Sequence, residues 1–529
     1  SASANLGVCF GSTRRAGQCY GGNFNQGLGV LGLTLATDDY NFFFQDDWRI
    51  NPRFTLNLGL RYEYQKNPTN AAARINPALP QTGTRVADKN NWGPRIGFAY
   101  DVKGDGKTSV RGGYGVYFGR VINSTVYNSL INTGVGTDVA QRQVTLQAAS
   151  AGSPIYPNLL TAGSLVPGAV QYFASNFQLP RIQQLDAVFE REIAHNTVVS
   201  ASYLFSYGQY LPNFVDTNLP VPGTPNLQFV NVVAVGGPAD GRVVRMPIFL
   251  GASQRTAFTT ARPNPLYAQI TEIRSDVFSK YNALVLQLNR RMTKGLQIQS
   301  NYTLSRAFDN GQSSVTFSSN NLPLVAYDQG GENALSGFDR RHKFTFSMVY
   351  NTSYKNKDNK AARALLNDWT IAPVFNWFSG QRYTGNVSGS IAAASAGYTP
   401  NAATGICIGP AGSDPATTPA CFTPGGGING SGGATRYPGL PRNFFKQPSI
   451  QFLDLRVSRR FGIGEKAKIE LLAEAFNFFN RTQVTTVNTT LYNLSGTTLT
   501  FNPTFGQTTG ADSTLFRERQ IQLAVRFEF

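Results

Sequence analysis

The segment Phe54–Tyr64, with the sequence FTLNLGLRYEY, alternates strictly between two kinds of side chain. Its even-numbered positions are apolar or aromatic: Phe54, Leu56, Leu58, Leu60, Tyr62 and Tyr64. Its odd-numbered positions are small, polar or charged: Thr55, Asn57, Gly59, Arg61 and Glu63. Because successive side chains of a β-strand point to opposite faces, this pattern predicts a strand with one apolar and one polar face.

Similar segments recur from residue 40 to the end of the chain. We predict strands at 40–49, 54–64, 92–101, 108–118, 181–193, 197–205, 281–291, 296–305, 342–352, 368–379, 449–460, 467–477 and 518–529. No segment approaches the ~18 consecutive apolar residues of a membrane-spanning helix. Alternating segments of about ten residues are instead typical of a transmembrane β-barrel.

The connections between these segments alternate between short and long. The short ones are Ile50–Arg53, Asp101–Lys107, Ala194–Asn196, Met292–Gly295 and Phe461–Lys466. We therefore predict an all-β, antiparallel outer-membrane β-barrel with short periplasmic turns and long extracellular loops. The longest loops, Gly119–Pro180, Ser206–Lys280 and Gly380–Pro448, are rich in Gly, Ser, Asn and Pro. We expect them to be irregular and to form the ligand-facing mouth.

The last strand ends on an aromatic residue, and its apolar face includes Val525, Phe527 and Phe529. In an outer-membrane barrel we expect this ending to be the signal that the barrel-assembly machinery reads. Counting back 13 strands from a periplasmic Phe529 places residues 1–39 on the extracellular side. Either Gly27–Ala36 is a fourteenth strand or the front of the barrel is missing, and we expect the second. Residues 1–39 are then a loop or a strand remnant, and 40–529 the C-terminal portion of the barrel.

The composition is aromatic and basic, with 12% aromatic residues, 15% charged residues and a net charge of +17. Lys and Arg are scattered and no nucleic-acid module is recognisable, so we expect no nucleic-acid partner. Basic lumen linings and loops that face lipopolysaccharide account for the charge. Aromatic residues near the predicted strand ends suit girdles at the membrane interfaces: Trp48, Tyr62, Tyr64, Trp92, Tyr117, Phe118, Tyr203, Phe205, Tyr350 and Trp369.

Four cysteines form two close pairs in glycine-rich sequence, Cys9 with Cys19 and Cys407 with Cys421. We expect loop-closing disulfides of an oxidising compartment, with free thiols as the alternative. Only two histidines are present and neither lies near a cysteine. We therefore predict no metal site and no cofactor.

Several motifs resemble the barrel of TonB-dependent receptors, in the subgroup that carries an N-terminal carboxypeptidase-regulatory-like domain (the Oar-like receptors). They are Phe44-Gln-Asp-Asp-Trp48, Asn51-Pro-Arg, Leu56-Asn-Leu-Gly-Leu-Arg-Tyr62, Gly93-Pro-Arg-Ile-Gly-Phe-Ala-Tyr100, Val110-Arg-Gly-Gly-Tyr-Gly-Val-Tyr117, Asn301-Tyr-Thr-Leu-Ser305, Phe338-Asp-Arg-Arg-His342, Ser379-Gly380 and Ala473-Glu-Ala-Phe-Asn-Phe-Phe-Asn480. The resemblance covers residues 40–529 and rests on the order and spacing of the motifs.

The resemblance implies a 22-stranded barrel occluded by an N-terminal plug, which imports iron chelates, cobalamin, glycans or peptides with energy from the TonB complex. This chain supplies about 13–14 of those strands. It shows no plug sequence and no TonB box, so we expect contact with the TonB complex to require an N-terminal part outside this chain. The surrounding partners would be outer-membrane lipids, lipopolysaccharide and the barrel-assembly machinery.

Charged residues on the polar faces are the candidate site. Arg95, Arg111 and Arg456 could pair with acidic residues of neighbouring strands, and residues 339–342 lie where a long loop returns to a strand. The predicted lumen and mouth cluster comprises Asp46, Asp47, Arg61, Arg95, Arg111, Asp339, Arg340, Arg341 and Glu474. These charges could stiffen the wall or bind a plug, or they could be solvated and contribute little. The glycines at 112, 113 and 115 lack the Lys-Ser/Thr of a phosphate loop and indicate close backbone approach within a strand.

These patterns favour a receptor or transporter for TonB-dependent uptake of an unidentified ligand such as an iron chelate, a glycan or a peptide. One alternative is a passive, porin-like channel. Another is a surface or adhesion protein that a barrel only anchors. An enzyme is not expected, because no Ser/His/Asp arrangement is visible.

Overall fold

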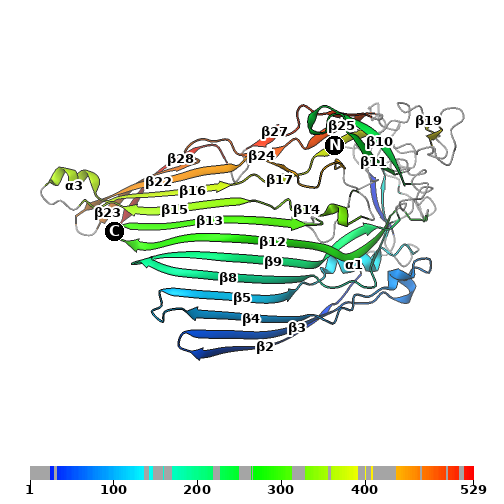
Figure 1. The fold of residues 1–529 in the computed structure, drawn as a ribbon, viewed down its shortest axis with the longest axis horizontal. Helices are drawn as coiled ribbons and strands as arrows, with labels where there is room; N and C mark the ends of the chain where they lie inside the picture. Colours follow the sequence, from blue (N-terminus) through cyan, green and yellow to red (C-terminus); the bar gives the residue numbers. More distant parts are fainter. Residues whose placement is uncertain are drawn as a thin grey trace.

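The computed structural model describes residues 24–28, 33–135, 142–146, 159, 169–218, 227–249, 264, 266–267, 269–311, 324, 328–354, 359–390, 399–400, 407–408, 436–464, 467–495, 498–511 and 517–529. One large antiparallel sheet dominates it (Figure 1). Within the described part, no helix is both long enough and apolar enough to cross a membrane.

Thirteen strands follow one another along this sheet in sequence order. They are β2 (Asp38–Asn51), β3 (Phe54–Lys66), β4 (Trp92–Asp101), β5 (Thr108–Phe118), β8 (Arg181–Ala194), β9 (Thr197–Asp216), β12 (Gln269–Thr293), β13 (Leu296–Asp309), β15 (His342–Asn351), β16 (Trp369–Phe378), β22 (Ile450–Ile463), β23 (Ala467–Phe476) and β28 (Gln520–Glu528). Each corresponds to one predicted strand, so the predicted antiparallel barrel wall is confirmed.

The strand register continues the alternation of single strands across the whole sheet. Leu58 lies opposite Ile96, Ile96 opposite Tyr114, and Tyr114 opposite Leu185. Because directly opposed residues of neighbouring strands point to the same side, these residues share one apolar face. At the other end of the sheet the same face carries Leu471 and Val525. We call this side the outer face and the polar side the inner face.

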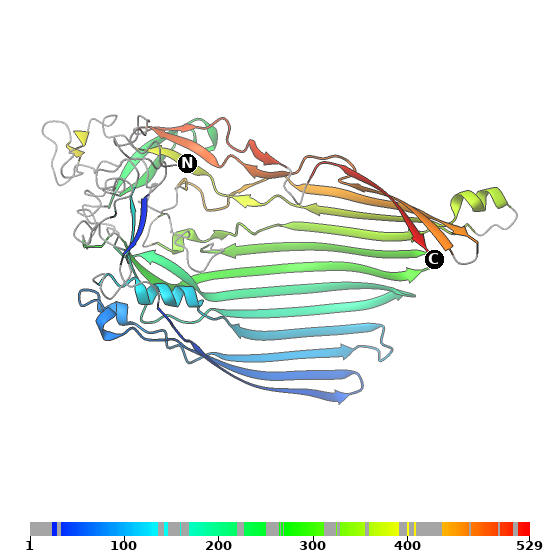
Figure 2. The same cartoon turned by 180° about the vertical axis from the view of Figure 1, so that it is seen from behind.

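The two ends of the sheet differ in the length of their connections (Figures 1 and 2). At the short-turn end, the carboxylate of Asp101 accepts hydrogen bonds from the backbone N–H groups of Gly104 and Gly106, each at 2.9 Å. Both glycines have positive φ angles, 73° and 69°, which other residues rarely adopt. The longer connection at this end holds α3 (Lys360–Leu366). The predicted separation of short and long connections is confirmed.

The sheet is open, with β2 and β28 as its edges (Figure 1). Neighbouring strands alternate in direction, and eleven strands lie between β2 and β28. The two edge strands therefore run in the same direction, toward the short-turn end. An all-antiparallel closure therefore requires an odd number of further strands. Of the alternative fourteenth barrel strand at Gly27–Ala36, residues 29–32 lie outside the described residues. The described Gly27 and Leu28 belong to β1 (Phe24–Leu28), which pairs with β6 (Arg142–Leu146) outside the large sheet, and residues 33–36 form no strand.

The long connections contain regular structure that the sequence did not suggest. Five strands from three different loops form a second sheet in the order β11-β10-β26-β25-β18. They are β10 (Leu227–Val235), β11 (Val243–Phe249), β18 (Asn386–Ser390), β25 (Thr490–Ser495) and β26 (Thr498–Phe501). We call this sheet and its hydrophobic core the extracellular cap.

The prediction of a continuous irregular loop at Ser206–Lys280 is wrong. There β9 continues to Asp216 and β12 begins at Gln269, so the two strands stay paired well beyond the residues expected. The pairing tolerates two irregularities between Arg274 and Ser279. Such bulges break strict alternation, which is the signal by which strands are recognised in sequence.

Further short helices and strands lie at the loop end of the sheet. In the described residues, the helices there are α1 (Asn123–Ile131) and four short 3-10 helices at Ala72–Arg74, Pro80–Gly83, Gly237–Ala239 and Gly330–Glu332. The remaining strands are β7 (Ala169–Phe173), β14 (Ala334–Leu335), β17 (Arg382–Tyr383), β19 (Thr399–Pro400), β20 (Cys407–Ile408), β21 (Phe445–Lys446), β24 (Val484–Val487) and β27 (Thr508–Ala511).

In the described residues, three hydrophobic cores lie at the loop end, among the loops and the extensions of β9 and β12. The core of the cap contains Val232, Ala234, Ala239, Val244, Val387, Tyr437, Leu491, Tyr492, Leu494 and Leu499. A second core joins α1 to the extensions of β9 and β12 through Val126, Phe173, Phe214 and Ile273. The third is smaller and includes Val170 and Tyr267. The loop end is therefore a packed structure.

Nine of the ten predicted girdle aromatics have the outer-face parity of the register. Among them Trp48 and Trp92 are 57% and 55% exposed, as side chains that face lipid should be in an isolated chain. Tyr117 is the exception, because it lies opposite Ile182 and both residues occupy inner-face positions of β5 and β8. The girdle prediction is wrong for this residue.

The packed cap generates a stability prediction. Leu499 is fully buried in the cap core, so Leu499→Ala should destabilise the cap by about 2–5 kcal/mol. Protease cleavage of the long loops on intact cells, followed against urea concentration, measures this loss. Val243→Ala is the matched control, since its side chain is 63% exposed on the same sheet. Equal shifts for the two variants would contradict a packed cap.

Candidate functional site

The inner face of the large sheet is lined with ion pairs between neighbouring strands. Arg111 Nη2 lies 2.8 Å from Glu190 Oε2. Arg456 Nη1 lies 3.6 Å from Glu474 Oε1, as predicted. Glu470 is almost fully buried and accepts a 2.7 Å hydrogen bond from Ser458 Oγ. The exposed pairs among these contribute little stability each, so their main effect is a charged wall that faces water.

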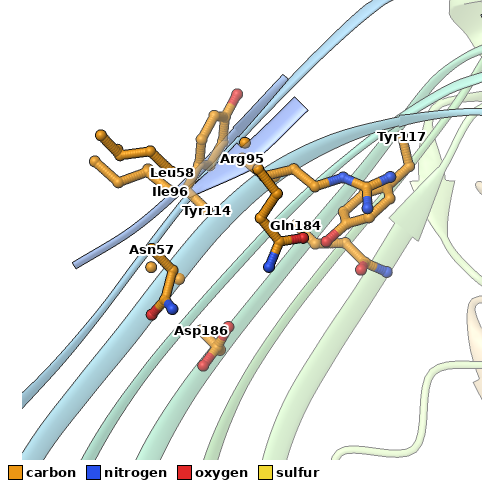
Figure 3. A pocket seen from close by; sticks show the side chains of 13 residues that line it. Asn57, Leu58, Arg95, Ile96, Tyr114, Tyr117, Gln184 and Asp186 are labelled. Carbon is orange, nitrogen blue, oxygen red and sulfur yellow. The ribbon is translucent and has the colours of Figure 1, made fainter. Parts of the chain in front are cut away.

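A recess of about 240 Å³ lies in this wall across β3, β4, β5 and β8. Figure 3 shows the side chains around it, with Asn57 and Asp186 at one end and Arg95 and Tyr117 at the other. The Arg95 guanidinium lies 4.6 Å from the centre of the Tyr117 ring, a cation–π contact. Gln184 stands between the two ends. The recess thus offers a positive end, a negative end and amide groups.

Glycines form the floor of the recess. Gly97, Gly113 and Gly115 face inward on β4 and β5, where a side chain would fill the space. A Cβ at Gly115 would come within 2.7 Å of the Tyr117 hydroxyl, so this glycine lets the Tyr117 ring lie across the strand. Gly112 faces outward and makes room for the Phe98 ring in the same way. Close backbone approach was predicted for the glycines at 112, 113 and 115. The nearest neighbours are side chains at all three, and a backbone carbonyl, that of Asp186, comes within 3.3 Å of a Cβ at Gly112.

A second group of charges is buried at the mouth, where loop residues meet. Glu332 is 4% exposed and lies 2.7 Å from Arg436 Nη2 and 3.2 Å from Arg442 Nε. Arg442 also pairs with the buried carboxylate of Asp309 and donates to the Glu332 carbonyl at 3.0 Å. The backbone N–H of Leu324 donates to Glu332 Oε1 at 2.8 Å. This mouth network fastens residues 436–446 to the loop that follows β13.

Asp339 and Arg382 form another ion pair at the mouth. The Oδ2 atom of Asp339 accepts a 3.2 Å hydrogen bond from Arg382 Nε, and its Oδ1 accepts one from the N–H of Ala307 at 2.9 Å. Asp339 is 1% exposed, so the charge is held by these donors in place of water. The following Arg340 and Arg341 act through their carbonyls, which accept from the side chain and N–H of Ser305. Burial lowers the pKa of Arg340.

Buried tyrosines hold the cap together. The Tyr492 hydroxyl accepts a hydrogen bond from the N–H of Ala239 at 3.0 Å and donates to the Gly236 carbonyl at 3.1 Å. The Tyr437 and Tyr492 rings lie 5.1 Å apart. Burial raises the pKa of both phenols and that of Tyr383, and it does the same for Tyr172 of β7, which lies in another core. The tyrosines therefore remain neutral hydrogen-bonding groups at physiological pH.

The structure distributes the predicted charge cluster over the wall and the mouth. Arg61 pairs with Glu63 and hydrogen-bonds Asn41 at 3.2 Å. Asp47 accepts from Asn57 on the inner face. Asp46 lies opposite Leu58, on the outer face, so the register does not place it with the lumen charges. The network of Glu332, Arg436, Arg442 and Asp309 was missed, because its members are up to 133 residues apart in sequence.

The family-like motifs mostly serve local structure. Asn477 has a φ angle of 49° and its N–H donates to Asp454 Oδ1 at 2.8 Å, which ends β23. A Cβ at Gly380 would overlap the Gln447 carbonyl, so only glycine fits there. The hydroxyl of Ser379 accepts from the N–H of His342 at 3.1 Å. These contacts align the ends of neighbouring strands.

The remaining predicted sites are exposed or lie outside the described residues. Val525 and Phe527 are 56% and 66% exposed on the outer face, and Phe529 is fully exposed. Cys9, Cys19 and Cys421 lie outside the described residues, and of Cys407 only the backbone, in β20, is described. Among the described residues, no group of His, Cys, Asp or Glu side chains could hold a metal ion.

Comparison with known families gives one match that covers most of the chain. The model of the family described as "Outer membrane beta barrel domain" matches residues 16–522. Among curated proteins none matches.

Several solved structures are similar in fold over 93% of this chain. One is the outer membrane transporter YddB from Escherichia coli, with 11% identity, 45% of that chain covered and a TM-score of 0.44. A second is the ferripyoverdine receptor of Pseudomonas aeruginosa, with 10% identity, 39% covered and a TM-score of 0.42. A third is the siderophore receptor PirA from Acinetobacter baumannii, with 8% identity, 46% covered and a TM-score of 0.42. The chain spans less than half the length of each.

The mouth network can be tested by removing one cation. Arg442→Gln leaves the buried Asp309 unpaired and Glu332 with one arginine, which should cost about 3–5 kcal/mol locally. Hydrogen exchange of the backbone amides of residues 436–446 measures this loss. Arg120→Gln breaks the exposed pair with Asp39 and should cost at most about 1 kcal/mol. Similar exchange rates in both variants would show that burial does not strengthen the mouth network.

The buried tyrosines predict that the cap weakens in alkali. Because the pKa of Tyr492 is raised above 10.0 in the folded cap, its stabilisation is complete below pH 10.0 and is lost as the pH rises through the raised value. Hydrogen exchange in β25 and β26 should therefore accelerate above pH 10.0, beyond the intrinsic rise. The double variant Tyr437→Phe and Tyr492→Phe should lose most of this excess. If the extra acceleration of exchange is the same in that variant, it arises from groups other than these two tyrosines.

Proposed function

Because the chain belongs to the outer membrane beta barrel domain family, we propose that it forms the wall and mouth of a receptor that imports a ligand across the outer membrane. The chain is located in the outer membrane, with its apolar face toward lipid and its polar face toward water. Uptake coupled to the TonB complex is part of the proposal, and the motifs in residues 40–529 support it.

The mouth carries this proposal, since its shape is fixed by packing and by buried charges. A cap with a core of ten buried residues stands over the loop end of the wall. The mouth network ties a further segment to it through carboxylates that are 3% and 4% exposed. Selective recognition needs groups held in place, because ordering them on binding would cost affinity. A passive porin, through which small solutes diffuse, needs no such fixed mouth.

The ligand class follows from the chemistry of the inner surface. The recess has a cation–π pair at one end and a carboxylate at the other, and the mouth adds exposed aromatic and charged side chains. Such a surface suits a polar ligand with several hydrogen-bonding groups, such as an iron chelate, a glycan or a peptide. We propose that the ligand contacts the recess after it passes the mouth.

The proposed partners of the chain follow from its exposed C-terminal residues and its family. The exposed outer-face residues Val525, Phe527 and Phe529 are the proposed contact with the barrel-assembly machinery. The TonB complex is the proposed source of energy. The chain is proposed to have no enzymatic role. Outer-membrane lipids and lipopolysaccharide are the proposed surroundings of the outer face.

Uptake measurements test this function. Cells that make the protein from its intact gene should accumulate one member of a panel of ferric siderophores, glycans and peptides. Accumulation should stop when the proton-motive force is dissipated or the TonB complex is deleted. Energy-independent entry of many small solutes would favour the porin-like alternative. Cell adhesion without uptake would favour the surface-protein alternative.

Filling the recess tests the path of the ligand. A Cβ at Gly97 would make only ordinary contacts, the nearest at 3.6 Å, so Gly97→Leu should fold and occupy the recess. We expect uptake to fall about tenfold, as for a loss of about 1.4 kcal/mol of binding. Gly462→Leu is the matched control, because a Cβ there meets nothing within 4 Å. Equal uptake by both variants, at equal amounts in the outer membrane, would exclude the recess from the path.

A further inference from the structure

Cations bracket the apolar stretch on the outer face of two strands. On β8 they are Arg181 and Arg191, and on β12 they are Lys280 and Arg290. Ten residues separate the members of each pair, or about 33 Å of strand. At the usual tilt of about 40°, this distance spans the ~25 Å apolar band of an outer-membrane barrel. The two pairs therefore mark the two headgroup levels of the membrane.

The extracellular level carries a row of three cations. Arg181 lies opposite Gln209 on β9, Lys280 lies opposite Tyr207 on β9, and Arg306 lies opposite Asn282 on β12. The register places all three side chains on the outer face of β8, β12 and β13, and these strands with β9 lie side by side (Figure 1). Across the strands the row spans about 14 Å, because strands lie about 4.8 Å apart. The register also displaces Lys280 and then Arg306 by two residues each along the strands, so Arg181 and Arg306 lie about 20 Å apart. We call Arg181, Lys280 and Arg306 the cationic row.

The cationic row is not neutralised by neighbouring side chains. In the described part of the chain, none of the three cations forms an ion pair with a carboxylate. The register also places no Asp or Glu on the outer face of β8, β9, β12 and β13 between the two headgroup levels. Lys280 and Arg306 are exposed. The row is thus a patch of positive charge without an internal partner.

Neutral groups position the cations and add hydrogen-bonding capacity. Arg181 Nη2 donates to Gln209 Oε1 at 2.7 Å, and its guanidinium lies 4.9 Å from the centre of the Tyr210 ring. Lys280 Nζ lies 5.8 Å from the centre of the Phe205 ring. The Tyr203 hydroxyl donates to Asn282 Oδ1 at 2.8 Å, which leaves the Asn282 amide donors for another acceptor. The row therefore presents several donors at one level.

From this arrangement we propose that the cationic row binds the phosphate groups of lipid A, the membrane anchor of lipopolysaccharide. The row faces lipid at the level of the outer leaflet, where the anions held next to it are those of lipid headgroups. Each basic residue at such a level gains attraction from anionic lipid. A lipid with two phosphates can meet more than one cation of a row about 20 Å long. The proposal rests on the outer-membrane location and not on the transported ligand.

Binding of defined lipids tests the proposal. The full chain, in detergent micelles, is titrated with rough lipopolysaccharide that carries both lipid A phosphates. Lys280→Gln with Arg306→Gln should raise the Kd about tenfold or more. Arg191→Gln with Arg290→Gln is the matched control, because it removes two cations from the same face at the periplasmic level. That variant should change the Kd less than about twofold.

The remaining arms identify the anion. Dephosphorylated lipopolysaccharide should bind the unchanged chain about as weakly as the intact lipid binds the Lys280 and Arg306 variant. Inorganic phosphate should not compete at concentrations that saturate lipopolysaccharide binding. Equal losses for the two double variants, or none for either, would overturn the proposal. Full competition by inorganic phosphate would also overturn it and indicate a site for free anions. Ligand uptake does not enter any arm, so a failure here leaves the proposed function untouched.

Discussion

Lipid offers no hydrogen bonds to a peptide group, and this constraint governs the fold. Each N–H and C=O within the hydrocarbon must be paired inside the protein, which a chain of this composition achieves only with adjacent strands. The large sheet meets the requirement along eleven of its strands, each of which pairs on both sides. Among the thirteen described wall strands, only β2 and β28 have an unpaired edge, and both run toward the short-turn end. Their common direction restricts antiparallel closure to an odd number of additional strands.

Beyond the lipid, water relaxes the constraint and the chain folds by the rules of soluble proteins. The cap buries apolar residues from three loops between short strands. The mouth network replaces water by arginine donors around Glu332 and Asp309. A buried network of this kind adds little net stability, because desolvation offsets the attraction, whereas the loss of one partner is costly. In the described residues, the cores thus lie at the loop end, where they include the extensions of β9 and β12, and not in the part of the wall that faces lipid.

The wall could be read from the sequence because lipid imposes a local pattern. The strands Trp92–Asp101 and Thr108–Phe118 have the boundaries predicted for them. Two errors on this wall were avoidable. Tyr117 was predicted for the lipid-facing girdle, but it is an even number of residues from the inward-facing Arg111 and so shares its face. Asp46 was predicted for the lumen, but it is two residues from the outward-facing Trp48 and so shares that face. The cap and the mouth network were not predictable in this way. Glu332 and Arg442 are 110 residues apart, and no local periodicity reports their contact.

The central claim is that one face of each strand meets lipid and the other meets water. Spin labels at single positions 298 to 304 of β13, in a chain whose four native cysteines are replaced by serine, measure this directly in lipid bilayers. Collisions with oxygen should be strongest at 298, 300, 302 and 304, and collisions with a water-soluble nickel complex at 299, 301 and 303. That alternation with period two is what the register predicts. Equal accessibility along the segment, or maxima with opposite parity, would contradict it.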